Sequence, residues 1–272
     1  MPLYVVATPI GNLRDLTERA REVLAACDAV VAEDTRHSGQ LVKRLGLQKP
    51  FISLPAFDEA ARVAPIVRRL QDGASLALVT DAGTPAVSDP GSLLVREAIA
   101  AGVQVVPVPG PSAVIAAVSV SGFPEGRFHF AGFLPRKSSA RDEMLSEIKH
   151  LRAQLAFYES PQRLRETLLE LKAALGDRPA LVARELTKVH EELARGTLSE
   201  LAEHFSNEVR GEIVIVVSGA REDAPEDPKA LEEEVRARLA RGERPKEISE
   251  ALSGRYPKRA VYQMAIKLKD PG

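Results

Sequence analysis

Residues 79–91 read Val-Thr-Asp-Ala-Gly-Thr-Pro-Ala-Val-Ser-Asp-Pro-Gly, and this loop decides the fold class. It continues from the apolar run 75–80, which we interpret as a buried strand. The loop therefore leaves the carboxyl end of a strand, where open α/β sheets bind their ligands. Asp81 and Asp89 offer acceptors for hydroxyls, an amine or a cation, and the small residues around them leave room for a small molecule. The alternative is an ordinary Gly/Pro turn.

Similarly unusual loops follow other predicted strands, and this repetition favours a ligand site over an ordinary turn. The run 3–8 ends in Thr-Pro-Ile-Gly-Asn, and Thr17 is a suitable N-cap for a helix up to residue 26. This loop has one glycine where a dinucleotide fingerprint needs three. A Rossmann dinucleotide fold is therefore not expected, whereas a doubly wound sheet is.

Two further strand ends are equally unusual. The run 29–32 ends in Glu-Asp-Thr-Arg-His-Ser, whose last residue, Ser38, is predicted to cap a helix at 40–45. The run 104–106 ends in Pro-Val-Pro-Gly-Pro-Ser-Ala. Its serine, Ser112, is either a simple helix cap or the start of a helix whose backbone N–H groups face a ligand.

Beyond residue 108 the pattern becomes mixed. The segments 178–185 and 191–197 are close enough to form an antiparallel pair, so the second sheet is expected to be mixed. Helices are predicted at 59–71, where Pro65 kinks the helix or delays its start, and at 93–101, 113–119, 141–151 and 162–175. Strands are predicted at 128–133, 154–158, 179–184, 191–197 and 213–217.

The length and charge distribution predict the domain organisation. The 272 residues suffice for two domains with real cores. A polar, Pro-bearing stretch at 221–228 indicates a linker. From Lys229 onward there are 11 Lys and Arg and 7 Asp and Glu, so the tail is basic while the whole chain has a net charge of −1. We expect an N-terminal α/β domain at 1–111, a mixed-sheet α/β domain at 112–220, and a basic helical domain at 229–272.

The composition of the chain excludes several classes of protein. No run is long enough to span a membrane, and a strand pattern begins at the N-terminus without a signal peptide. The single cysteine, Cys27, excludes an internal disulfide and a thiolate metal cluster, and we expect it to be a small buried residue. We therefore predict a cytoplasmic protein without a metal site.

Seven ordered blocks carry a family resemblance over essentially the whole chain. They include TPIGNLRDLT, AEDTRHSG, DAGTP, PGPSA and FYESP, followed by ARELTK and GEIVIV. In these blocks the chain resembles the bacterial small-subunit ribosomal RNA ribose 2′-O-cytidine methyltransferases of the tetrapyrrole-methylase superfamily. The first loop departs from the Gly-rich loop of the wider superfamily, which fits the ribosomal RNA branch and argues against a porphyrinoid substrate.

The resemblance implies two α/β domains of tetrapyrrole-methylase type, a small helical C-terminal domain and a homodimer. It also implies S-adenosylmethionine in the cleft between the two α/β domains. Carried over by position, the implied cofactor residues are Pro9, Asp81, Gly83, Thr84, Ala86, Val87, Ser112, Ala113, Tyr158, Leu186, Glu212 and Ile213.

Methyl transfer to a ribose hydroxyl needs an aligned nucleophile and benefits from a nearby base. The candidates at strand ends are Asp34, His37, Asp81 and Glu185. Each has a plainer alternative: Asp34 pairs with Arg36, His37 contacts a phosphate or a base, and Asp81 holds the cofactor or a water.

Clusters of cations predict the RNA contacts, because phosphate binding depends on them. The candidates are Arg36, His37, Arg136, Lys137, Arg163, Lys188, Arg255, Lys258 and Arg259. Solvated helix faces are their alternative, and for Lys188 a solvated loop. Two short helices in the tail form a helix-turn-helix-like pattern, with Tyr256 and Tyr262 expected to stack on bases.

Three functions are consistent with these observations. The first is a methyltransferase acting on a ribose hydroxyl of small-subunit ribosomal RNA. The others are a methyltransferase of the same architecture acting on a small molecule such as a porphyrinoid, and a ribosome-assembly binding protein without catalysis.

Overall fold

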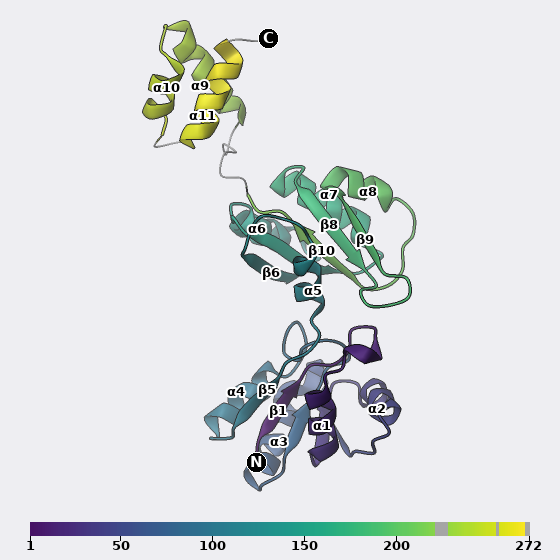
Figure 1. Cartoon of the computed structure of the whole chain (residues 1–272). Coiled ribbons are helices and arrows are strands. Elements are labelled where there is room, and N and C mark those ends of the chain that lie inside the picture. Colours follow the sequence, from purple (N-terminus) through teal and green to yellow (C-terminus); the bar gives the residue numbers. More distant parts are fainter. Residues whose placement is uncertain (221–227, 254–255, 270–272) are drawn as a thin grey trace.

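The computed structural model describes residues 1–220, 228–253 and 256–269, and it contains two five-stranded sheets followed by a helical tail (Figure 1). The first sheet has the order β3-β2-β4-β1-β5, and all its registered pairs are parallel. Its strands are β1 (Leu3–Val6), β2 (Ala29–Ala32), β3 (Phe51–Ser53), β4 (Leu76–Leu78) and β5 (Val105–Val108).

Helices cover both faces of this sheet, as a doubly wound fold requires. One face packs against α3 and α4 through residues such as Ile66 and Leu94, and the other packs against α1 and α2 through Leu24 and Val42. The elements are α1 (Glu18–Ala26), α2 (Thr35–Arg44), α3 (Glu59–Gln71) and α4 (Ser92–Ala100), with short 3-10 turns at Leu13–Asp15 and Ala56–Asp58.

The second sheet is mixed, in the order β6-β7-β10-β8-β9. Only β6 runs parallel to its neighbour, β7, and the predicted β8–β9 hairpin is antiparallel. The strands are β6 (Phe128–Phe133), β7 (Gln154–Glu159), β8 (Pro179–Arg184), β9 (Glu192–Thr197) and β10 (Ile213–Val217).

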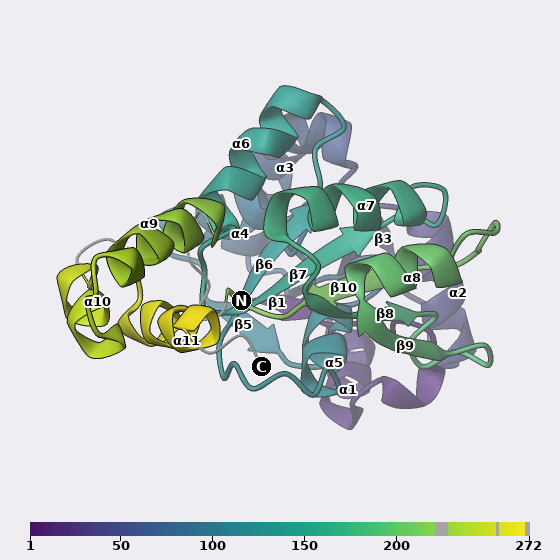
Figure 2. The same ribbon diagram turned by 90° about the horizontal axis from the view of Figure 1, so that it is seen from above.

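The two faces of the second sheet are covered differently. The outer face packs against α6 (Ser138–Ile148), α7 (Leu164–Leu175) and α8 (Leu198–His204) around the fully buried Phe157 (Figure 2). The inner face packs against α5 (Ala113–Ser119), which lies on the side toward the first sheet (Figure 1). Each sheet thus has its own packed core, and α5 lies on the side of the second sheet that faces the first.

The tail helices α9 (Pro228–Ala240), α10 (Pro245–Ala251) and α11 (Lys258–Lys269) enclose a small core of their own. Tyr256 belongs to this core and is 7% exposed, so the expectation that it stacks on bases is wrong. Tyr262 on α11 is exposed, as stacking would require. Residues 221–227 of the expected linker and the predicted RNA contact Arg255 lie outside the described residues.

The fold class and most predicted elements are confirmed, including the N-cap at Thr17 and the buried Cys27. Three expectations were incomplete or wrong. Strand β3 and helix α8 were not predicted, and Pro65 does not delay the start of α3, which spans the predicted residues Glu59–Gln71. The expected cap Ser38 lies inside α2, because Asp34 caps that helix by accepting from two backbone N–H groups.

Candidate functional site

A cavity of about 420 Å³ lies between the two sheets, at the loops that leave the carboxyl ends of β1, β4 and β5. The first domain contributes Ile10 and the loop after β4, and the second contributes the ends of β7 and β10 and the loop after β8. Such a volume suits a cofactor-sized ligand. The residues that line this cofactor cleft are Ile10, Asp81, Ala82, Gly83, Thr84, Val87, Ser88, Asp89, Ser112, Ala113, Phe133, Tyr158, Glu159, Ser160, Pro161, Ala183, Leu186, Gly211, Glu212, Ile213 and Val214.

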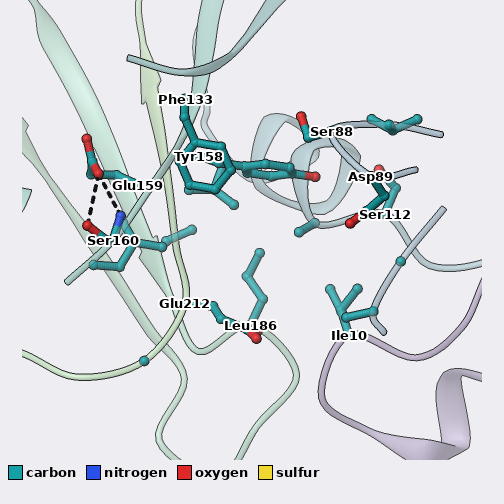
Figure 3. Close-up of a pocket in the computed structure, with 18 of the residues that line it drawn as sticks. Ile10, Ser88, Asp89, Ser112, Phe133, Tyr158, Glu159, Ser160, Leu186 and Glu212 are labelled. Atoms are coloured by element: carbon teal, nitrogen blue, oxygen red, sulfur yellow. Dashed lines mark hydrogen bonds between the residues drawn. The ribbon is translucent and has the colours of Figure 1, made fainter. Parts of the chain in front are cut away.

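One part of the cleft is flat and apolar. The ring of Tyr158 packs edge-on against Phe130, with ring centroids 4.8 Å apart, and lies 5.7 Å from Phe133. Figure 3 shows Ile10 on the opposite side of the pocket, facing Leu186. Side chains of this kind provide a surface on which a planar heterocycle can pack.

Another part of the cleft is acidic. Burial raises the pKa of Asp89, and the neighbouring Asp81 raises it further. Burial also raises the pKa of Glu33, with Asp81 and Asp89 adding to the shift. Figure 3 shows the Tyr158 hydroxyl directed toward Ser88 and Asp89. Burial is the main cause of both shifts, and the smaller contributions from Asp81 and Asp89 show that carboxylates lie near one another here, an arrangement that favours a cationic group.

The turn after β7 is held by a buried carboxylate. The Glu159 side chain is 1% exposed and accepts from the backbone N–H of Ser160 at 2.7 Å (Figure 3). It also accepts from the Thr167 hydroxyl at 2.6 Å. Arg163 lies 3.8 Å from the same carboxylate and donates to the Leu134 carbonyl. Arg163 therefore has a structural role in the second domain, and its expected role as an RNA contact stays a prediction.

The two domains touch closely beside the cleft. A Cβ atom on Gly11 would lie 2.5 Å from Lys188 Cγ, 2.8 Å from Thr187 Oγ1 and 2.9 Å from the Leu186 carbonyl oxygen. Glu185 and Thr187 adopt positive φ angles of 54° and 67°, which are uncommon for residues other than glycine. The loop after β8 thus lies directly against the first loop of the chain, and each loop contributes a neighbouring residue to the cleft, Leu186 from the loop after β8 and Ile10 from the first loop.

A second cavity, of about 270 Å³, adjoins the cofactor cleft. Four residues line both cavities: Ile10, Asp81, Ala82 and Glu212. We call the second cavity the α2 pocket, because α2 supplies one wall of it. Its other lining residues are Pro9, Gly11, Leu13, His37, Gln40, Leu41, Arg44 and Lys188.

Ten of the twelve expected cofactor residues line the cleft. The exceptions are Pro9, which lines the α2 pocket instead, and Ala86, which lines neither cavity and has a φ of 66°. Sequence reasoning did not assign Ile10, Phe133 or Ser160 to the site. Ile10 and Ser160 sit inside motifs that were recognised, TPIGN and FYESP, so the signal was present.

The structure places the four candidate bases in different surroundings. Asp81 lies at the junction of the two cavities and His37 lies in the α2 pocket. Asp34 caps α2 and pairs with Arg36 at 3.4 Å, contacts that lower its pKa. Glu185 lines neither described cavity. It accepts from Lys188 Nζ at 2.8 Å, which lowers its pKa, and from the backbone N–H of Glu212 at 3.0 Å. These contacts lower the pKa of both carboxyls and so disfavour Asp34 and Glu185 as proton acceptors, and their expected role as bases stays a prediction.

The comparisons with known proteins agree with this geometry. The family model "Tetrapyrrole (Corrin/Porphyrin) Methylases" matches residues 2–202. The methyltransferase CobJ superposes with a TM-score of 0.62 at 20% identity, over 80% of this chain and 94% of that one. The cobalt precorrin-4 methyltransferase CbiF superposes with a TM-score of 0.60 at 19% identity and the same coverage. The fold is thus that of the tetrapyrrole methylases.

Relatives that are similar in sequence show to which branch of the tetrapyrrole methylases the chain belongs. A "Ribosomal RNA small subunit methyltransferase I" from Xylella fastidiosa (strain Temecula1) is 50% identical, over 80% of this chain and 81% of its own length. The protein of the same name from Haemophilus influenzae is 43% identical, over 97% of this chain and 96% of its own. That from Mesorhizobium japonicum is 44% identical, over 98% and 92%. The chain belongs to the ribosomal RNA small subunit methyltransferase I family of tetrapyrrole methylases.

Proposed function

We propose that the chain is an S-adenosylmethionine-dependent methyltransferase that methylates the ribose 2′-hydroxyl of a cytidine in small-subunit ribosomal RNA. The observation that carries the proposal is the junction of two cavities at Asp81 and Glu212, one suited to a nucleoside cofactor and one lined by cations. The family relatives, which are named for small-subunit ribosomal RNA methylation, support the choice of acceptor.

The cleft residues fit the cofactor. Tyr158, Ile10 and Leu186 offer apolar surface for the adenine, while Ser88, Ser112 and Asp89 offer partners for hydroxyl and amine groups. The crowded carboxylates favour a cationic donor over a neutral one. When bound there, S-adenosylmethionine supplies an electrophilic methyl group on a positively charged sulfur.

The residues at the junction serve the acceptor. A ribose hydroxyl is a weak nucleophile, so a proton acceptor beside it assists the displacement. Asp81 is exposed to both cavities, and we assign it this role. His37 faces only the α2 pocket, where it is suited to contact the RNA.

The Asp89→Asn variant is expected to raise thermal stability and to weaken cofactor binding. Burial raises the pKa of the Asp89 carboxyl above its ordinary value, so the charged carboxylate destabilises the fold at any pH above its folded-state pKa, and the cost disappears only below the ordinary pKa of an aspartate. Asparagine should therefore raise the Tm at neutral and alkaline pH. The gain should shrink as the pH falls below the folded-state pKa of Asp89 and vanish below the ordinary value. Affinity for S-adenosylmethionine should fall by about tenfold. Thermal unfolding across pH and titration calorimetry measure both effects, and an unchanged affinity would contradict the acidic subsite.

Further RNA contacts are proposed outside the cavities. Arg136 and Lys137 are exposed after β6, and Lys258 and Arg259 are exposed at the start of α11, near Tyr262 in sequence. The domain boundaries, the homodimer and the cytoplasmic location stay predictions. None of the described helices is long and apolar enough to cross a membrane.

One experiment distinguishes the proposed function from its rivals. The chain is incubated with methyl-labelled S-adenosylmethionine and either undermodified small ribosomal subunits or a porphyrinoid acceptor. Label is expected in the ribosomal RNA alone. Label in the porphyrinoid would favour the small-molecule enzyme, and binding to subunits without cofactor heat in calorimetry would favour the assembly protein.

A further inference from the structure

We propose that one face of α2, formed by His37, Gln40 and Arg44, binds the RNA strand at the target nucleotide, and that Arg44 holds a phosphate next to the methylated ribose. This inference rests on the proposed function and deepens it, because it places the RNA backbone within the α2 pocket. None of the three residues belongs to the acidic part of the cofactor cleft.

The helix geometry selects this face. Residues 37, 40, 41 and 44 follow the i, i+3, i+4, i+7 spacing that places side chains on one side of a helix. All four line the α2 pocket, whereas Arg36 and Lys43, on the same helix, do not. The cap at Asp34 fixes where α2 begins and hence which residues face the pocket.

The charges in the α2 pocket make Arg44 the residue best suited to bind a phosphate. Lys188 also lines the pocket, but its Nζ lies 2.8 Å from Glu185 Oε1 and 3.1 Å from Glu212 Oε2. Two carboxylates therefore already compensate its charge. Arg44 is exposed and makes no ion pair with any described residue, so its guanidinium is available for the bidentate contact that phosphates favour.

The position of the α2 pocket explains what the charge of Arg44 would bind. The α2 pocket meets the cofactor cleft at Asp81 and Glu212, where a carboxylate would repel a phosphate and a ribose hydroxyl would be tolerated. An RNA strand with one phosphate at Arg44 can therefore present the neighbouring ribose toward the junction of the two cavities. Gln40 offers both a donor and an acceptor to a base edge beside it.

Arg36 was the stronger candidate from sequence. Its side chain is 90% exposed, pairs with Asp34 at 3.4 Å and lies outside both cavities. Arg36 can add to the general attraction for RNA, but it is not placed to position the target nucleotide.

The test compares Arg44→Ala with Lys43→Ala. Both residues are exposed cations in the last turn of α2, so the two variants lose the same charge and the same favourable interaction with the helix dipole. Only Arg44 lines the α2 pocket. The readouts are kcat/KM for methylation of undermodified small subunits, S-adenosylmethionine affinity by calorimetry, and the salt dependence of subunit binding.

Arg44→Ala is expected to lower kcat/KM by about 10- to 100-fold through loss of a charge-assisted phosphate contact, with cofactor affinity unchanged. The slope of log K against log salt should become shallower by about 0.7, as for one phosphate on a single strand. Lys43→Ala should stay within about twofold, and Arg44→Lys should recover part of the activity.

Equal effects of Arg44→Ala and Lys43→Ala on an active enzyme would overturn the inference, because they would reveal a general charge effect. A loss of cofactor affinity in Arg44→Ala would also overturn it. If the wild-type chain methylates no ribosomal RNA, the proposed function itself fails, which is a separate and recognisable result.

Discussion

Replacing Gly11 by valine is expected to weaken S-adenosylmethionine binding by about 100-fold or more. A Cβ at this position would lie 2.9 Å from the carbonyl oxygen of Leu186 and closer still to two side-chain atoms of the same loop. A backbone oxygen cannot rotate away, so the loop after β8 must retreat as a whole. Leu186 would then move away from Ile10, and the cleft that both residues line would change shape.

Gly39→Ala is the matched control for this variant. Gly39 lies in α2, has no positive φ, and its nearest atom to an added Cβ is 4.0 Å away. Alanine there should leave cofactor binding intact and raise stability slightly, since alanine favours the helix. Calorimetry on both variants checks the prediction. Wild-type affinity in Gly11→Val would show that the interdomain contact does not shape the cofactor cleft.

Replacing Asp81 by asparagine is expected to lower kcat by about 100-fold or more, the usual contribution of a general base. Asparagine keeps the size and one acceptor oxygen but cannot take a proton. Cofactor affinity should change far less than turnover, because Asp89 and the apolar walls remain. Single-turnover methylation of small subunits, combined with calorimetry, separates the two effects.

Glu212→Gln is the matched control, because Glu212 is the other carboxylate at the junction of the cavities. Its side chain is 70% exposed and pairs with Lys188, so it is less suited to receive a proton from a bound ribose. We expect its kcat to fall by less than about tenfold. Near-normal turnover in Asp81→Asn, or an equal loss in both variants, would remove Asp81 as the proton acceptor.

The parts of the fold that were predictable had strong local signals. Apolar runs ending in Gly- and Pro-rich loops placed three of the five strands of the first sheet, an apolar run ending in a charged loop placed β2, and Thr17 marked the start of α1. Strand β3 escaped prediction because it has only three residues, flanked by Pro50 and by Pro55 after Leu54, and it exists through pairing with the edge of β2. Helix α8 had a readable signal, the capping box between Thr197 and Glu200.

The site was predictable where a motif lay in one segment and less so where a pocket depended on tertiary packing. The loop 79–91 was correctly placed in the cleft. The α2 face was missed, because assigning the cap to Ser38 started the helix at residue 40 and separated His37 from Arg44. Glu185 looked like a candidate base in sequence, but only the structure shows its contact with Lys188. Tyr256 likewise proved to be buried in a core to which all three tail helices contribute, which the sequence of its own segment does not reveal.

The central claim is that the cofactor cleft and the α2 pocket form one compartment in which a methyl donor meets an RNA ribose. Its most direct test is mapping of the labelled nucleoside after reaction of the chain with methyl-labelled S-adenosylmethionine and undermodified small subunits. We predict label on the ribose 2′-oxygen of a cytidine in small-subunit ribosomal RNA, greatly reduced in Gly11→Val and in Asp81→Asn. Label on a base atom, or no transfer by a chain that binds the cofactor, would contradict the claim.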